Sequence, residues 1–366
     1  MKNTSIEWAD HTFNPWSGCT KVSPGCANCY AETLAKRAPK TLGGWGAGAP
    51  RRRTSEKYWK QPLRWNAEQE RRMDVLTPGM ARIDYPLTRP RVFCASLADW
   101  LDDEVPVAWL ADLMRLIWET PNLDWLLLTK RPENFERRMN AAYLAQPGAT
   151  GHSLMMARWT NGIQSTPPAN VWIGTTVEDQ PRADERIPAF LRIPARVHFL
   201  SGEPLLGPVD LRLNRADRVV HQMEKCAAFP GFAHAGKRSL IDWVICGGES
   251  GPKARPMHPD WARSLRDQCA GAGVAFFFKQ WGEWAPGVAR LKRYDPANPD
   301  AYVNEVRWCS TGGTVVITER TKERNLTTPE REPHRFENGE ILTYRVGKSE
   351  AGRLLDGVEH NAVPKA

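Results

Sequence analysis

Three cysteines within eleven residues near the N-terminus are the feature of this sequence best suited to chemistry. They lie in the run Cys19-Thr-Lys-Val-Ser-Pro-Gly-Cys26-Ala-Asn-Cys29. A [4Fe–4S] cluster or a tetrahedral zinc ion takes four ligands. Three thiolates on one loop therefore predict a metal site with one position left for a ligand from elsewhere. Pro24-Gly25 predicts a tight turn before Cys26, and the two-residue gap to Cys29 lets both sulfurs face one ion.

The cellular compartment decides whether cysteines are more often disulfide-bonded or metal-binding. The chain of 366 residues contains eight cysteines, begins without an apolar signal core and has no apolar run long enough to span a bilayer. We therefore expect a cytoplasmic protein that does not bind the membrane. Thiols stay reduced in the cytoplasm, where clustered cysteines favour a metal over disulfides. His11 and His258 are the histidines considered as a fourth ligand.

The charge balance points to polyanions. The formal net charge is +8 and the sequence pI is about 9.1. Such a surface attracts nucleic acid, and we expect a nucleic acid or nucleotide as partner. The run 51–60 mixes basic and aromatic residues, as surfaces that bind single strands do, or it is an ordinary exposed basic loop.

The apolar pattern alternates between short strands and amphipathic helices, which is typical of a parallel sheet with crossover helices. We predict an α/β fold: a (β/α) barrel, TIM-like or partial, over residues 1–285, with an appended C-terminal β-rich extension over 286–366. Stretches 140–168 and 214–239 read as loop insertions, and 315–319 with 341–346 as a strand pair. The expected strands are 91–96, 124–129, 170–175, 196–201, 242–246 and 274–279, after a less clear one before Cys19; the expected helices are 105–119, 132–140, 180–190 and 259–271.

Polar residues follow almost every expected strand, and in β/α barrels the loops after the strands build the active site. Glu203 and Glu249 stand in two Gly-Glu turns, where a pair of carboxylates would serve acid–base chemistry or bind a divalent metal. Lys130 and Lys279, with Arg131 and Arg255, would place positive charge at the mouth for a phosphate or carboxylate. The alternatives are plain β-to-α turns and salt partners for the glutamates.

Several tryptophans fall inside expected strands and are predicted to be core residues. Trp281 follows the last strand, where it would either stack on a flat ligand or close the barrel floor.

A group of motifs in this chain resembles the bacteriophage-associated three-Cys-motif family, over about residues 3–284. The motifs are Asn14-Pro-Trp-Ser-Gly-Cys19, Gly25-Cys26-Ala-Asn-Cys29-Tyr30-Ala, Leu128-Thr-Lys-Arg-Pro132, Glu203-Pro-Leu-Leu-Gly-Pro208, Gly247-Gly-Glu-Ser-Gly251 and Phe278-Lys-Gln-Trp-Gly282. That family is similar to radical S-adenosylmethionine (SAM) enzymes. The resemblance also implies a location, the cytoplasm of a bacterial cell that is infected by a phage or carries a prophage.

The resemblance implies a mechanism and a set of residue roles. Cys19, Cys26 and Cys29 would hold three irons of a [4Fe–4S] cluster, SAM would chelate the fourth, and one-electron reduction would release a 5′-deoxyadenosyl radical. The first gap between cysteines is six residues here and three in typical members. Residues implied to contact the cofactor are Tyr30, after the third cysteine, and either Gly247, Gly248 and Glu249 or, after the second strand, Ser96 and Asp99.

Two other classes of function stay open on the sequence alone. The first is a zinc-stabilised protein that binds nucleic acid without redox catalysis, with the three thiolates and a histidine in a closed structural site. The second is a barrel that recruits a partner protein and catalyses nothing.

Overall fold

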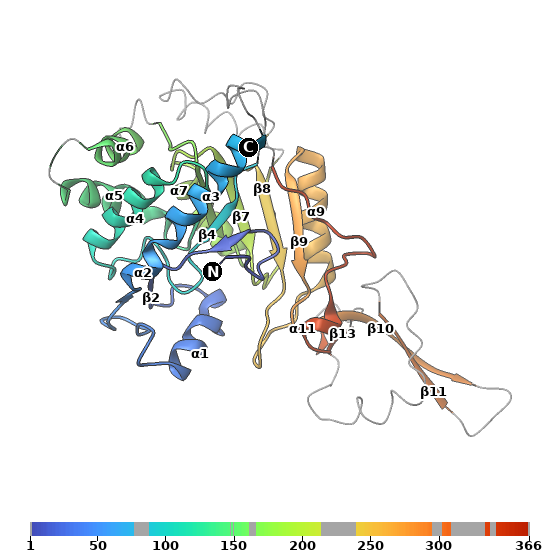
Figure 1. Cartoon of the computed structure of the whole chain (residues 1–366). Coiled ribbons are helices and arrows are strands. Elements are labelled where there is room, and N and C mark those ends of the chain that lie inside the picture. Colours follow the sequence, from blue (N-terminus) through green and yellow to red (C-terminus); the bar gives the residue numbers. More distant parts are fainter. Residues whose placement is uncertain are drawn as a thin grey trace.

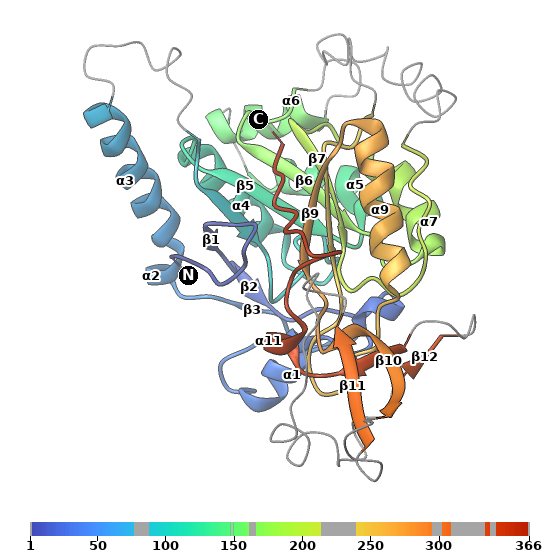
Figure 2. The same ribbon diagram turned by 90° about the vertical axis from the view of Figure 1, so that its right-hand side faces the viewer.

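A curled sheet of seven parallel strands forms the centre of the protein. The computed structural model describes residues 2–76, 88–146, 148, 150–160, 166–213, 239–294, 302–308, 334–336 and 342–364. Neighbouring strands in the sheet follow one another in chain order, and the sheet curls into an open half-barrel (Figures 1 and 2). The strand order is β1 (His11–Thr12), β4 (Arg91–Cys94), β5 (Asp124–Thr129), β6 (Val171–Thr176), β7 (Val197–Gly202), β8 (Trp243–Gly247) and β9 (Ala275–Gln280).

Helices cover the outer face of the half-barrel. All six clear strand predictions and all four helix predictions are confirmed, with ends shifted by a few residues. The stretch 140–168, expected to be a loop insertion, contains a helix, and 214–238 lies outside the described residues. The helices around the sheet are α3 (Gln61–Leu76), α4 (Val107–Glu119), α5 (Phe135–Leu144), α6 (Gly151–Thr160), α7 (Gln180–Phe190) and α9 (Pro259–Ala272).

The two faces of the sheet pack differently because side chains alternate along each strand. Outward residues such as Val92, Trp125 and Val244 join the large core beneath the helices. The inner face carries a second, mainly aromatic core, and Trp8 from the N-terminal segment packs into it against Phe93 at a ring distance of 4.7 Å. The interior of the half-barrel is therefore filled, and the inner core comprises Trp8, Ala9, Phe93, Leu126, Trp172, Val197, Phe199, Trp243, Ile245 and Phe277.

A small antiparallel sheet follows the last barrel strand. Its order is β11 (Tyr302–Trp308), β10 (Trp284–Tyr294), β13 (Leu342–Arg345) and β12 (His334–Arg335). Strand β13 confirms the strand expected within 341–346, whereas 315–319 lies outside the described residues. This sheet lies at the same end of the barrel as α1 (Tyr30–Arg37), the lower end in Figure 2.

The C-terminal segment returns to the barrel after α11 (Lys348–Ala351). Along the edge strand β9, the amide of Phe278 donates to the carbonyl of His360 at 2.9 Å. The Trp281 indole is buried and donates to the Leu354 carbonyl at 2.9 Å, so it anchors this segment. The returning segment thus covers the edge of β9.

In the part of the chain that the structure describes, no helix is long and apolar enough to cross a membrane.

Candidate functional site

The loop that carries the three cysteines lies over the carboxyl ends of the parallel strands. It runs from β2 (Trp16–Ser17) through the short helix η1 (Pro24–Cys26) into α1. Its side chains and backbone contact residues that follow β4, β5, β6 and β8. The structure therefore places the loop at the end of the barrel where the polar strand-end residues gather.

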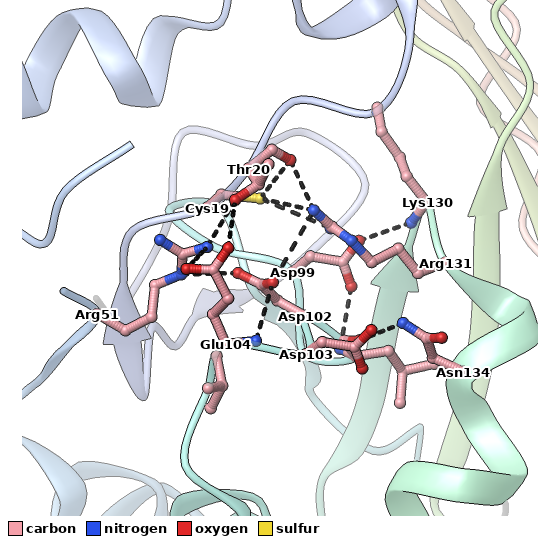
Figure 3. Close-up of polar contacts among 12 residues, drawn as sticks. Cys19, Thr20, Arg51, Asp99, Asp102, Asp103, Glu104, Lys130, Arg131 and Asn134 are labelled. Carbon is pink, nitrogen blue, oxygen red and sulfur yellow. Dashed lines mark hydrogen bonds and ion pairs between the residues drawn. The ribbon is translucent and has the colours of Figure 1, made fainter. Parts of the chain in front are cut away.

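Cys19 is held against Arg131, which follows β5. The two terminal nitrogens of the guanidinium, Nη1 and Nη2, lie 3.7 and 3.8 Å from Cys19 Sγ, and Nη2 also donates to the Thr20 carbonyl at 2.6 Å (Figure 3). Burial and the neighbouring Asp99 carboxylate raise the pKa of the Cys19 thiol to about 11, against the opposing effect of Arg131. A bound metal would have to displace this proton to gain a thiolate ligand.

Cys26 lies in the part of the loop that packs on Glu178, the second residue after the end of β6. The Ser23 hydroxyl donates to Glu178 Oε1, and the same carboxylate accepts from Arg186 Nη1 at 2.7 Å. A Cβ on Gly25 would lie 2.5 Å from Glu178 Oε1, so only glycine allows this approach. Glu178, fully buried, therefore fixes the turn before Cys26.

Cys29 precedes α1, and its neighbours tie this end of the loop to β4 and β8. Asn28 Nδ2 donates to Glu249 Oε2 at 3.1 Å and to the Lys253 carbonyl at 2.7 Å. The Tyr30 hydroxyl donates to the Ser96 carbonyl at 2.7 Å, while much of its ring stays exposed. Tyr30 and Ser96, both expected at a cofactor, are thus brought together beside the cysteines.

Glu249 is the better connected of the two predicted glutamates. Arg255 donates to it from Nε at 2.8 Å and from Nη2 at 2.6 Å. Burial alone would raise the pKa of Glu249, but the hydrogen bonds from Arg255 and Asn28 outweigh it, and the pKa is lowered. Gly248 lies so close to the Trp281 carbonyl that a Cβ would be 1.9 Å from it. The Gly-Gly-Glu turn is therefore tightly packed, and its carboxylate faces the cysteine loop.

The second predicted glutamate forms a separate ion pair. Glu203 Oε1 lies 2.8 Å from Lys279 Nζ, and a Cβ on Gly247 would lie 3.0 Å from the same oxygen. Across the described residues, neither Glu203 nor Lys279 has a hydrogen bond to the cysteine loop. Lys130 Nζ donates to Thr176 Oγ1 at 3.0 Å and lies 3.9 Å from Glu178 Oε1. Of the four predicted catalytic residues, Glu203 and Lys279 therefore form one pair, while Lys130 and Glu249 each contact other residues.

The cationic side chains at the strand ends have carboxylate partners. This arrangement was the alternative to a positively charged rim that binds a phosphate or carboxylate. Asp99 accepts from Arg131 Nη1 at 2.9 Å, from the Thr129 hydroxyl at 2.7 Å and from the Lys130 amide at 2.8 Å. Together with Lys279–Glu203 and Arg255–Glu249, these contacts neutralise charge around the rim. Asp99, predicted to contact a cofactor, here orients the residues that follow β5.

Arg51 forms a second buried cationic contact with the loop that sequence reasoning did not identify. Its Nε donates to Asp102 Oδ2 at 2.8 Å and its Nη2 to the Thr20 hydroxyl at 2.8 Å (Figure 3). Nearby, the Arg53 guanidinium stacks on Trp59 at 3.9 Å. Both arginines belong to the run considered as a surface for single strands, and in this structure they make internal contacts.

Two histidines considered as fourth ligands have other roles in the structure. His11 stacks on Trp65 at a ring distance of 4.4 Å, in β1. His258 caps α9 and accepts from the Asp260 amide at 3.1 Å.

A cleft of about 600 Å³ lies beside the cysteine loop, between α1 and the glycine-rich run 42–50. Trp45 contributes to its wall, and its backbone bridges that of Cys19. The volume is in the range of small-molecule sites. Its lining residues are Glu32, Ala35, Lys36, Pro39, Leu42, Gly43, Gly44, Trp45, Pro50, Arg51 and Arg52.

The donor set of the loop suits an iron–sulfur group in kind and number. Cys19, Cys26 and Cys29 are free thiols, each partly exposed, on one loop. Thiolates are the usual ligands of such clusters, each on a different iron. Among the described residues, no three or more His, Cys, Asp or Glu side chains converge so as to hold a single metal ion.

Comparison with family models gives one match over almost the whole chain. The matching model, described as "Protein of unknown function (DUF5131)", covers residues 3–364. The chain belongs to the DUF5131 family. Comparison with curated proteins and with solved structures gave no match. The range matched by the family model includes the barrel, the cysteine loop and the C-terminal sheet.

Proposed function

We propose that this member of the DUF5131 family is an iron–sulfur enzyme of radical-SAM type. Cys19, Cys26 and Cys29 would hold a [4Fe–4S] cluster, and SAM would take the open position. The observation that carries the proposal is the fixed position of the cysteine loop. Residues at both its ends and at its central turn are bonded to groups at the carboxyl ends of β4, β5, β6 and β8.

The residues of the chain would hold and orient this group. Arg131 and Arg51 bind the backbone and side chain of Thr20, next to the first cysteine. Glu178 accepts a hydrogen bond from Ser23, in the turn before the second cysteine. Glu249 accepts one from Asn28, the residue before the third cysteine. Each cysteine thus has an anchor on a different strand end. When bound and reduced, a cluster of this class supplies the electron that cleaves SAM.

The filled interior sets where a substrate would bind. Because the inner aromatic core occupies the half-barrel, a substrate would lie on the rim, over the strand ends, and not deep within the sheet. Lys130, Glu203 and Lys279 are then the ionisable groups offered to it, with Tyr30 exposed beside the loop. We propose a nucleic acid or nucleotide as the substrate class because of the net charge of +8, in a bacterial cytoplasm with a phage or prophage.

The test is SAM cleavage by protein reconstituted with iron and sulfide without oxygen. With dithionite as the electron donor, we expect the wild type to convert SAM to methionine and 5′-deoxyadenosine. Cys26→Ala should lose this activity and its cluster while remaining folded. Cys269→Ala removes a buried thiol in α9 and serves as the matched control, which should keep the activity. Equal activity in Cys26→Ala and wild type would refute the proposal, as would one tightly bound zinc per chain with no iron.

A further inference from the structure

We infer that Arg131 is a positioning residue that raises the reduction potential of the cluster bound through Cys19. The inference rests on the proposed function, since it concerns the group that the cysteines would hold. It assigns the three cysteines unequal roles: Cys19 is the ligand whose sulfur lies against the Arg131 guanidinium.

The guanidinium of Arg131 is fixed before any cofactor binds. Its Nη1 donates to Asp99 Oδ2 at 2.9 Å and its Nη2 to the Thr20 carbonyl at 2.6 Å, and the residue is buried. The backbone is held as well, because its amide donates to the Thr129 hydroxyl at 2.9 Å. The planar fork of an arginine loses little freedom when such bonds form. The two N–H groups that face Cys19 are therefore preorganised.

Both terminal nitrogens of that fork approach one sulfur. Cys19 Sγ lies 3.7 Å from Nη1 and 3.8 Å from Nη2, within the range of N–H···S hydrogen bonds. Cys26 Sγ has a different neighbour, the Ser23 hydroxyl at 3.6 Å, which carries no charge. The described contacts thus give a cationic partner to the first cysteine and a neutral one to the second.

Acidic residues hold this arrangement from the far side. Asp99 binds Arg131, and Asp102 binds Arg51 through an ion pair of 2.8 Å. Since Arg51 and Arg131 both bond to Thr20, the backbone beside Cys19 is gripped from two directions (Figure 3). The sulfur of Cys19 therefore has little freedom to move away from the guanidinium.

A cation with two donors on a ligand sulfur acts on the electron that the cluster accepts. The oxidised cluster would take one electron from dithionite, and no bond to the protein forms or breaks. The added negative charge is delocalised onto the sulfurs, and hydrogen bonds to them stabilise the reduced state. Arg131 should therefore make the potential less negative than it would be without these contacts.

The experiment measures the midpoint potential of the reconstituted cluster with iron and sulfide content in the same samples. Arg131→Lys keeps a positive charge near Asp99 but cannot place two donors on Cys19, so we expect unchanged iron content and a shift to more negative potential. Arg138→Lys is the matched control, because Arg138 is buried and donates to the Val105 carbonyl at 2.6 Å. The midpoint potential of the cluster in this variant should equal that of the wild type.

The outcomes separate this inference from the proposed function. A wild type without iron and sulfide overturns both. A loaded wild type whose potential is matched by Arg131→Lys, or a shift equally large in Arg138→Lys, overturns only the role of Arg131. If Arg131→Lys does not fold, Thr129→Val replaces it, because it removes the hydroxyl that accepts from the Arg131 amide and changes no charge near the cluster, and a shift to more negative potential is again required.

Discussion

Replacing Glu178 by glutamine tests whether a buried ion pair anchors the cysteine loop. Glu178 is fully buried and lies 2.7 Å from Arg186, whose side chain is 3% exposed. Removing the negative charge leaves the Arg186 cation buried without its partner. Breaking a buried pair in this way costs roughly 3–5 kcal/mol, and we expect Glu178→Gln to lose about 3 kcal/mol because the amide still accepts one hydrogen bond.

Urea unfolding followed by tryptophan fluorescence gives the free energy of unfolding for this comparison. Glu185→Gln is the matched control on α7, the helix that carries Arg186, since the Glu185 side chain is 70% exposed and its pair with Arg182 spans 3.6 Å. An exposed pair of this kind contributes about 0–1 kcal/mol. In a double-mutant cycle, Glu178→Gln and Arg186→Met should couple by about 2 kcal/mol.

The loop itself provides a second readout. Because Ser23 and Gly25 rest on the Glu178 carboxylate, hydrogen exchange over residues 20–29 should accelerate in Glu178→Gln and stay unchanged in Glu185→Gln. If Glu178→Gln unfolds within about 0.5 kcal/mol of the wild type, or the cycle shows simple additivity, the pair does not anchor the loop and the reasoning fails.

Three further predictions concern the loop, the Gly-Gly-Glu turn and the barrel edge. Gly25→Ala should lower both melting temperature and cluster content, because its Cβ would lie 2.5 Å from Glu178, whereas Gly207→Ala, with a nearest contact of 3.6 Å, should change neither; equal behaviour of the two would contradict the packing described. The lowered pKa of Glu249 means that its contribution to stability is complete above pH 4.5 and is lost as the pH falls through the lowered value. The gap in melting temperature between wild type and Glu249→Gln should therefore be full at neutral pH and close in acid, and a gap that persists in strong acid speaks against the assignment. Deleting residues 353–366 uncovers the edge of β9 and should produce self-association in size-exclusion chromatography, and an unchanged elution volume would argue that the edge needs no cover.

The barrel was predictable because its strands are buried on both faces. Runs such as Asp124–Thr129 and Ala275–Gln280 each contain four consecutive apolar residues and stand between helix-start signals, so pattern alone locates them. The helices α1 and α3 were not predicted. Helix α3 is rich in charged and amide residues, which blurs its apolar stripe.

The position of the cysteine loop was predictable, but its anchors were not. A loop after the first strand must reach the carboxyl ends of its parallel neighbours, which placed Cys19, Cys26 and Cys29 near Ser96 and Glu249. The partners themselves depend on loop conformation. Asn28 meets Glu249 across 221 positions, and Arg131 meets Cys19 across 112, distances over which a single sequence carries no pairing signal. The exclusion of a Cβ at Gly25 was likewise invisible until Glu178 was placed beside it.

Metal and acid-labile sulfide analysis of protein purified without oxygen tests the central claim most directly. The account predicts about four iron and about four sulfide per chain, with a broad brown absorption band that disappears in Cys26→Ala but not in Cys269→Ala. A colourless protein with one zinc per chain, or iron retained fully by Cys26→Ala, would contradict the claim that these three cysteines hold an iron–sulfur cluster.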